Sequence, residues 1–262
     1  MHINCIGNNF LHISPKTKHF TWIYNDIKSD VTFFLDENII LAFDKYSNLN
    51  GKKFGWLVES RFLNNFVKIW ILQNLKICKR YFENIFTCDD DLLKRDTFFK
   101  FVPGNNTLIQ NYQENKKTKR ISMICSDKEY TTLQKFRKNF AFKNKQNFDL
   151  YGRNINDIIC KEQGLNEYMF SVAIENDIYP NYYTEKLLDC FATKTVPIYI
   201  GSPNIGPFDE KGVIRLTKEF DFSLLTEKVY LEFQQEIDYN YNLVQKYKCL
   251  GTFIYENYLT FM

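Results

Sequence analysis

Short apolar runs, separated by polar turns, recur along the first part of the chain. Runs of this kind predict β-strands, and they occur at residues 31–35, 39–43, 53–58 and 84–87. A polar, turn-rich segment at residues 103–120 ends this pattern and is the best linker candidate in the chain. We therefore expect one small α/β domain at residues 1–110 and a second domain at residues 111–262.

One long stretch of the first domain follows a different period. From residue 60 to residue 82, apolar side chains recur at helical spacing, which predicts a single amphipathic helix. Its expected buried face includes Phe62, Phe66, Ile69, Trp70 and Ile77, and its expected solvent side includes Lys68, Lys76 and Lys79.

Strands and helices alternate regularly in the second domain. Strands are expected at residues 121–125, 148–151, 168–174, 196–200 and 212–216, and helices at residues 129–142, 155–160, 185–192 and, with breaks, 222–258. Such alternation favours a parallel, doubly wound α/β sheet. Ligands of these sheets bind at the carboxyl ends of the strands, so the candidate chemistry is sought there.

Composition and charge narrow the class of protein. Of the 262 residues, 45% are hydrophobic and 25% are charged, which is typical of a globular chain. A formal net charge of +3 gives no indication of a nucleic-acid partner. We find neither a leader-like start nor an apolar run of the roughly 20 residues that a membrane span needs. The expectation is a cytoplasmic protein without an integral membrane segment.

Cysteine and histidine usage restricts the chemistry further. The seven cysteines are scattered and include no C-x-x-C pair, so neither a disulfide framework nor a structural zinc site is expected. The three histidines, His2, His12 and His19, all fall near the start of the chain. A general base further along is therefore expected to be a carboxylate.

The strongest local signal begins where the strand at residues 168–174 ends. Glu175 and Asn176 follow directly, at the edge where a parallel sheet presents its ligand site. After a tyrosine-rich loop, Glu185 and Lys186 occupy the first turn of a helix, where free N–H groups and the helix dipole favour an anion. Because that dipole disfavours a lysine, Lys186 is better explained by a bound phosphate than by helix stability.

Each of these residues also has an ordinary structural explanation. Glu185 can be a first-turn acid, Lys186 a surface lysine and Asn176 a turn residue. Their occurrence together at one strand–loop–helix corner favours the functional interpretation.

Residues 168–208 resemble the donor-binding signature of glycosyltransferase family 10, the alpha-1,3/4-fucosyltransferases. That signature runs from an apolar strand through E-N, a tyrosine-containing spacer and T-E-K-[LI] to V-P-[IV]-x-x-G. The chain carries these parts in order, at Glu175-Asn176, Tyr182, Thr184-Glu185-Lys186-Leu187, Val196-Pro197-Ile198 and Gly201. Weaker matches occur at WLVESR (56–61), IFTCDDDLL (85–93), FKFVPG (99–104) and SMICSDKEYTTLQKFRKNF (122–140).

The resemblance implies a fold and a reaction. The fold is of the GT-B type, with two Rossmann-like domains facing across a cleft, the acceptor-side domain at residues 1–110 and the nucleotide-sugar domain at residues 111–262. The implied donor substrate is GDP-fucose, the acceptor is an oligosaccharide or other glycan, and the anomeric carbon is inverted. No cofactor is required and no metal is essential.

Five donor-site residues follow from the resemblance by position. Arg137 and Lys186 are expected on the donor diphosphate, where positive charge stabilises the leaving group without a metal. Asn176, Tyr182 and Glu185 are expected to hold the donor, with Glu185 on sugar or ribose hydroxyls.

The general base implied by the resemblance is Glu59, in the acceptor-side domain. A carboxylate suits the removal of the acceptor hydroxyl proton in a site without histidine. The competing interpretation is a strand-end carboxylate that forms an ion pair with Arg61. The chain departs from the family in its shorter length and in Ser126-Asp127, where the family has a serine followed by asparagine.

Two other classes of function stay open from the residues alone. Asp89, Asp90 and Asp91 follow a predicted strand and could form the D-x-D metal site of a different glycosyltransferase class, although Asp91 is better explained as a helix N-cap. The chain could also be a non-catalytic nucleotide-sugar-binding protein or, with its basic linker, a nucleic-acid module.

Overall fold

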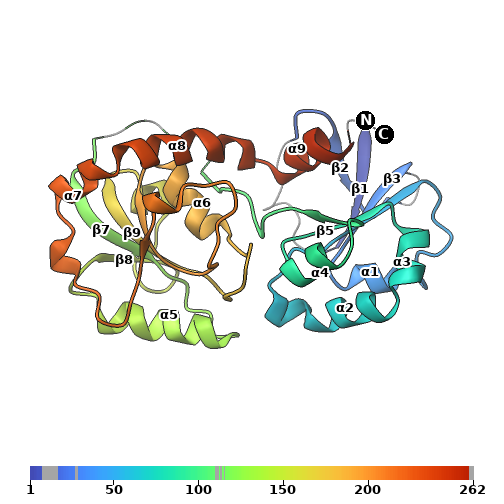
Figure 1. Ribbon diagram of the computed structural model, residues 1–262, viewed down its shortest axis with the longest axis horizontal. Coiled ribbons are helices and arrows are strands. Elements are labelled where there is room, and N and C mark those ends of the chain that lie inside the picture. The colour runs from blue at the N-terminus through green and yellow to red at the C-terminus, as the bar shows by residue number, and fades with distance from the viewer. Residues whose placement is uncertain (8–16, 27–28, 110–111, 113, 115, 260–262) are drawn as a thin grey trace. The chain divides into compact units, whose positions relative to one another are not determined.

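The computed structural model describes residues 1–7, 17–26, 29–109, 112, 114 and 116–259. The chain divides into two compact units, shown in Figure 1. Unit 1 comprises Met1–Asn106, Pro180–Tyr182 and Cys249–Met262, and unit 2 comprises Thr107–Tyr179 and Tyr183–Lys248. Residues 110 and 111, between which the domain boundary is predicted, lie outside the described residues, as does His12. No helix in the described ranges is long and apolar enough to cross a membrane.

Unit 1 is built on a six-stranded parallel sheet in the order β2-β1-β3-β4-β5-β6. Its strands are β1 (His2–Ile6), β2 (Thr21–Tyr24), β3 (Val31–Leu35), β4 (Lys52–Trp56), β5 (Asn84–Thr87) and β6 (Phe99–Phe101). Its helices are α1 (Asn38–Leu41), α2 (Arg61–Gln73), α3 (Leu75–Tyr81), α4 (Asp90–Arg95) and α9 (Leu250–Ile254), with a final turn η6 (Tyr255–Leu259). Figure 1 shows α9 on one side of this sheet and α1 and α2 on the other.

The predicted strand at residues 39–43 is wrong, because α1 occupies this position. Asp36 ends β3 with a φ of +50°, and the chain turns immediately after the strand. Parallel strands cannot be joined by a tight hairpin, so the chain must cross over between β3 and β4. Ile39 is fully buried within that crossover, which explains its apolar character.

The predicted helix at residues 60–82 exists, but as two helices, and the predicted buried face is partly wrong. Asn74 separates α2 from α3. Phe62, Phe66 and Ile69 are 58%, 57% and 46% exposed, whereas Lys68 is buried. The apolar side chains on the buried face are instead Val67, Ile71 and Cys78. Ion pairs to Asp89 and Asp91 compensate the burial of Lys68, whereas Lys76 and Lys79 are exposed as predicted.

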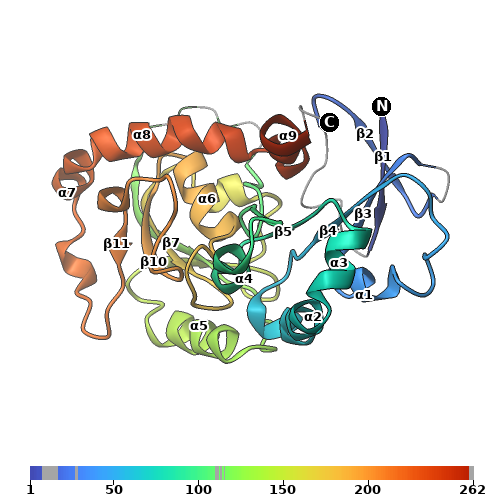
Figure 2. The same cartoon turned by 45° about the vertical axis from the view of Figure 1, so that its right-hand side comes forward.

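Unit 2 contains a five-stranded parallel sheet in the order β11-β10-β9-β7-β8. Its strands are β7 (Lys119–Ile124), β8 (Asp149–Tyr151), β9 (Tyr168–Ile174), β10 (Val196–Ile200) and β11 (Ile214–Arg215). Its α-helices are α5 (Thr132–Lys143), α6 (Glu185–Ala192), α7 (Glu227–Glu232) and α8 (Gln234–Val244), and a short 3₁₀ helix, η2 (Lys161–Gly164), precedes β9. Figures 1 and 2 show α6 and α8 on one side of the sheet and α5 on the other. The predicted doubly wound parallel sheet is thus confirmed.

The predicted helix at residues 155–160 is wrong. Gly152 has a φ of +145°, and a Cβ on it would lie 1.7 Å from the carbonyl oxygen of Cys125. Asn154 also has a positive φ, and Gly152 forms an isolated bridge with Asn156. The chain therefore turns back on itself after β8, and helical structure begins only at η2.

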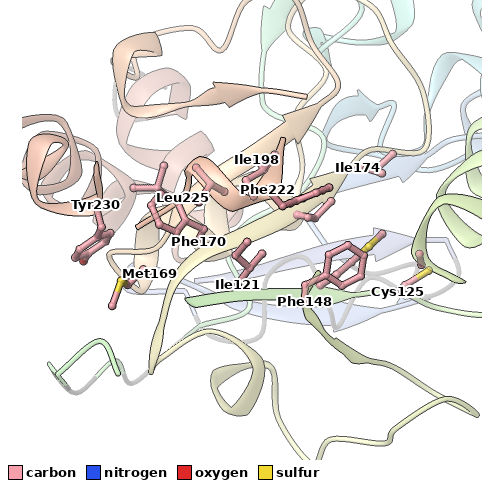
Figure 3. Close-up of a cluster of buried hydrophobic side chains, with 14 of the residues drawn as sticks. Ile121, Cys125, Phe148, Met169, Phe170, Ile174, Ile198, Phe222, Leu225 and Tyr230 are labelled. Carbon is pink, nitrogen blue, oxygen red and sulfur yellow. The ribbon is translucent and has the colours of Figure 1, made fainter. Parts of the chain in front are cut away.

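The core of unit 2 fills the space between the sheet and its helices. Ile121, Phe170 and Ile198 project from the central strands and are at most 3% exposed. Figure 3 shows Phe148, Phe222 and neighbouring side chains closing around them. Burial of a large apolar side chain contributes about 1.5–3 kcal/mol, so this cluster holds the strand ends in fixed register.

All seven cysteines are free thiols, as expected. Five are buried, Cys249 is partly buried and Cys160 is exposed. Most of them therefore act as small apolar side chains.

Candidate functional site

The carboxyl end of β9 carries a buried carboxylate, Glu175, which joins the strand to the start of α6. Its Oε1 accepts a hydrogen bond from the Thr184 backbone N–H at 2.9 Å, and its Oε2 accepts one from the Thr184 hydroxyl at 2.6 Å. Burial raises the pKa of Glu175, and Lys186, whose Nζ lies 3.7 Å from Oε2, opposes that shift. The strand end and the helix start are thereby fixed relative to one another.

Thr184 is the N-cap of α6. Its hydroxyl oxygen accepts a hydrogen bond from the Lys186 backbone N–H at 3.4 Å. The Lys186 ammonium lies 2.9 Å from Glu185 Oε1 and 3.2 Å from Thr184 Oγ1, and its side chain is 20% exposed. A cation is therefore held at the first turn of a helix, where the backbone already favours an anion.

Arg137 reaches the same strand end from the opposite side of the sheet. It lies on α5 and is 4% exposed. Its Nη1 donates to the Ile174 carbonyl at 3.0 Å and to Asn176 Oδ1 at 2.9 Å, and its Nη2 lies 3.4 Å from Ser126 Oγ. Its Nε is buried and makes no hydrogen bond within the described residues. A buried guanidinium N–H without a partner is consistent with a ligand oxygen as its acceptor.

Arg137, Glu185 and Lys186 border a cavity of about 150 Å³ in unit 2. Ser126, Lys161, Ser171 and Asp189 also line it. Arginine, lysine and a helix N-terminus together form a set of donors suited to a diphosphate.

Lys161 and Asp189 are cavity residues that the sequence does not reveal. The Lys161 ammonium lies 2.7 Å from Asp189 Oδ2, and Asp189 Oδ1 accepts hydrogen bonds from the Thr107 hydroxyl and the Leu108 N–H, at 2.8 and 2.7 Å. Lys161 comes from η2, directly after the segment wrongly predicted as helix. No local pattern marks such a position, because the turn after β8 alone brings it to the cavity.

The structure brings together four of the five predicted donor residues. Arg137, Asn176, Glu185 and Lys186 all lie in unit 2 near the carboxyl end of β9. Tyr182 is buried but belongs to the segment Pro180–Tyr182, which is grouped with unit 1.

Glu59, the predicted general base, lies in unit 1 after the end of β4. It is exposed, and its backbone N–H donates to Asp36 Oδ1 at 3.3 Å. Arg61 pairs instead with Asp89 and Asp90, at 2.8 and 2.7 Å. The alternative interpretation of Glu59 as the ion-pair partner of Arg61 is thus not supported by the contacts in the described part of the chain.

The three consecutive aspartates form ion pairs with basic side chains. Asp89 contacts Lys68 at 3.0 Å in addition to Arg61, Asp90 contacts Lys94 at 2.9 Å, and Asp91 contacts Lys68 at 2.6 Å. The N-cap of α4 is Asp89 rather than Asp91, since its Oδ1 accepts from the N–H groups of Asp91 and Leu92. The described residues contain no histidine, cysteine and carboxylate cluster that could hold a metal ion.

Comparison with known sequences identifies the region that contains this cavity. Residues 114–211 match the family model described as glycosyltransferase family 10 (fucosyltransferase), C-terminal part. The alpha-(1,3)-fucosyltransferase FucT of Helicobacter pylori is 36% identical over 64 residues, which are 23% of this chain and 13% of that protein. A fucosyltransferase-like protein of Arabidopsis thaliana is 38% identical over 63 residues, which are 23% of this chain and 12% of that protein.

Solved structures extend the similarity to both units. A crystal structure of an alpha1,3-fucosyltransferase covers 92% of this chain and 80% of that chain, with a TM-score of 0.52 and 15% identity. A second crystal structure of an alpha1,3-fucosyltransferase, described as containing GDP, covers 88% of this chain and 81% of that chain, with a TM-score of 0.54 and 15% identity. At this identity the similarity establishes the fold, two Rossmann-like domains of the GT-B type. The sequence similarity lies at residues 114–211, which resemble the C-terminal part of glycosyltransferase family 10, and the chain spans only about an eighth of the length of the curated relatives it matches.

Proposed function

We propose that this chain is an inverting glycosyltransferase that moves fucose from GDP-fucose to a hydroxyl group of a glycan. The observation that carries the proposal is the convergence of Arg137 and Lys186 on one cavity inside the region matched to family 10. The names of its relatives support fucose as the sugar. A protein of the same fold has been crystallised with GDP, which supports guanosine diphosphate as the leaving group.

The proposed donor site uses the contacts already described. Arg137 and Lys186 would contact the diphosphate, with the N–H groups of the first turn of α6 adding further donors. The Glu185 carboxylate would accept hydrogen bonds from hydroxyls of the donor, and the Asn176 amide would exchange hydrogen bonds with them. Tyr182 is proposed to contact the donor as well. The diphosphate carries negative charge that increases as the glycosidic bond breaks, so these cations stabilise the transition state more than the ground state.

The proposed chemical step is a direct displacement. Glu59 removes the proton of the acceptor hydroxyl while that oxygen forms a bond to the anomeric carbon, and the bond from this carbon to the diphosphate oxygen breaks. GDP leaves with the bonding electron pair, and the configuration at carbon inverts. No metal is essential in this proposal, because Arg137 and Lys186 supply the positive charge that a metal provides in other sites.

The test combines donor, acceptor and base. Purified protein is incubated with GDP-fucose and a panel of β-galactoside and N-acetylglucosamine-containing glycans, and the products are identified by mass spectrometry and by the anomeric NMR signal. Glu59→Gln should lower the transfer rate by about 10²–10⁴-fold, because a positioned base is lost. GDP affinity and melting temperature should stay unchanged.

Glu83→Gln is the matched control. Glu83 is also exposed and precedes a strand of unit 1, so its removal should leave transfer intact. If the transfer rate of the Glu59→Gln variant stays within about threefold of the wild-type rate, another residue must be the base, because the expected loss is at least about 10²-fold. Transfer from UDP-sugars but not from GDP-fucose would contradict the donor assignment.

A further inference from the structure

Asp36 makes an unusual set of contacts at the carboxyl end of β3. Its Oδ1 accepts hydrogen bonds from the Val58 N–H at 2.8 Å and the Glu59 N–H at 3.3 Å, and a short one from the side-chain amide of Asn64. Its own backbone N–H donates to the Trp56 carbonyl at 3.0 Å. One side chain therefore ties the end of β3 to the segment after β4 and to α2.

The backbone of Asp36 is held in a conformation that most residues avoid. Its φ is +50°, in the left-handed region that Asp, Asn and Gly tolerate best. This turn directs the carboxylate back toward the N–H groups of Val58 and Glu59. Backbone strain of this kind persists only where surrounding contacts stabilise it, and here those contacts are the ones to Glu59 and its neighbours.

We propose that Asp36 is a positioning residue for Glu59. The inference rests on the proposed role of Glu59 as general base. Glu59 is exposed, and three rotatable bonds separate its carboxylate from the backbone. The carboxylate can therefore be positioned reproducibly only if the backbone of Glu59 is itself fixed. Asp36 supplies that restraint through the Glu59 N–H, and it acts on the reaction only through Glu59.

The restraint depends on protonation. The pKa of Asp36 is raised to about 6, chiefly by burial and to a smaller extent by the nearby charge of Glu59, against the opposing effect of the hydrogen bonds from Val58, Asn64 and Glu59. Among the described residues, the buried thiol of Cys5 on β1 also faces Asp36. Below about pH 6, protonated Asp36 becomes a weaker acceptor, so the transfer rate should fall as pH decreases through this value.

Two substitutions preserve the turn and separate charge from hydrogen bonding. Asp36→Asn tolerates a positive φ and keeps an acceptor oxygen, but it cannot titrate. Asp36→Gly also tolerates a positive φ, but it removes the acceptor. Asp96→Gly is the matched control in unit 1, because Asp96 Oδ1 accepts from the Phe98 N–H at 2.8 Å, away from Glu59 in sequence.

The kinetic parameters, the pH profile and the double variant with Glu59→Gln decide the proposal. Asp36→Gly should lower kcat about tenfold or more and leave GDP affinity unchanged, since positioning acts on the reacting groups. Asp36→Asn should recover most of kcat at neutral pH and lose the fall in rate near pH 6. Asp96→Gly should change neither kcat nor the pH dependence of the rate.

The double variant distinguishes the two ways of failing. If Glu59→Gln alone leaves transfer unchanged, the proposed base is wrong. A second outcome is that Glu59→Gln strongly lowers the transfer rate while Asp36→Gly alone has full activity. A third is that Asp36→Gly lowers the rate of the Glu59→Gln variant by the same factor as it lowers the rate of the wild type. In either case Glu59 is the base, but Asp36 does not position it. Non-additive loss, with Asp36→Gly silent in the Glu59→Gln background, supports the proposal.

Discussion

Lys186 and Arg137 are held in place by different means, and the difference has consequences for binding. Lys186 lies beside two carboxylates, Glu175 and Glu185, so a phosphate that contacts it must compete with those partners. Arg137 donates to a backbone carbonyl and to Asn176, which are neutral acceptors, and its Nε has none in the described part of the chain. Arg137 therefore keeps more unused donor capacity for a ligand oxygen.

Removal of either cation should weaken GDP binding. Arg137→Ala and Lys186→Ala each delete a charge-assisted contact of about 1.5–3 kcal/mol, which corresponds to a roughly 10- to 150-fold increase in Kd. Calorimetric titration with GDP measures the change. Lys138→Ala is the control, because Lys138 lies next to Arg137 on α5 but pairs with Glu129. Unchanged GDP affinity in both variants would mean that the diphosphate binds elsewhere.

Glu175 should make the stability of unit 2 depend on pH. Its folded-state pKa is raised by burial, so above the ordinary value of 4.5 the folded protein binds more protons than the unfolded chain. Stability of the wild type relative to Glu175→Gln, which does not titrate, should therefore decrease as pH rises from 4.5 through the folded-state pKa, by up to about 1.4 kcal/mol per pH unit. Melting temperatures of both proteins across this range test the prediction, and parallel curves would contradict it.

At the scale of elements, two helices begin with the same kind of side-chain cap but have different surroundings. Thr184 and Asp89 both cap a helix by accepting backbone hydrogen bonds. In α6 the following turn presents Lys186 to a cavity. In α4 the acidic turn is neutralised by Arg61 and Lys68 of α2. A run of aspartates that suggests a metal site in the sequence is therefore part of an ion-pair network between helices.

The role of Asp89 can be tested by two substitutions. Asp89→Asn keeps the helix cap but loses the charge that pairs with Arg61 and Lys68, whereas Asp89→Ala loses both. Asp89→Ala should be less stable than Asp89→Asn by about 1 kcal/mol in urea denaturation, the usual contribution of an N-cap. Transfer by the wild type should be unaffected by EDTA. A requirement for Mn²⁺ that is lost in Asp89→Asn would instead support the D-x-D alternative.

Periodicity predicted the elements of unit 2 better than those of unit 1. The strands β9 and β10 and the helix α6 fall at the predicted residues, because a fully buried parallel strand leaves a continuous apolar run in the sequence. In unit 1, the outward face of α2 is apolar and its buried face contains Asn64 and Lys68. Periodicity cannot identify a buried lysine whose partner, Asp89, is distant in sequence.

The molecule as a whole consists of two parallel-sheet units, each with polar groups at the carboxyl ends of its strands. In unit 2 these groups are Glu175 and Asn176 after β9, and in unit 1 they are Asp36 after β3 and Glu59 after β4. This is where such sheets bind ligands. The repeated arrangement is compatible with the proposed donor site in unit 2 and the proposed base in unit 1.

The motif in the sequence was sufficient to predict the resemblance of residues 114–211 to glycosyltransferase family 10, and four of the five residues it proposes for the donor lie near the carboxyl end of β9. It could not reveal Lys161, Asp189 or Asp36, because their roles depend on contacts between segments far apart in the chain, such as Asp189 with Thr107 and Asp36 with Asn64.

The central claim is that the cavity of unit 2 binds the guanosine diphosphate part of a nucleotide sugar. Calorimetric titration of the purified chain with GDP, UDP and ADP tests it most directly, with Lys186→Ala measured alongside to locate the site. We expect GDP to bind at least about tenfold more tightly than UDP or ADP, a difference of about 1.4 kcal/mol, and Lys186→Ala to weaken this binding. Preference for UDP, or GDP binding that Lys186→Ala and Arg137→Ala leave unchanged, would contradict it.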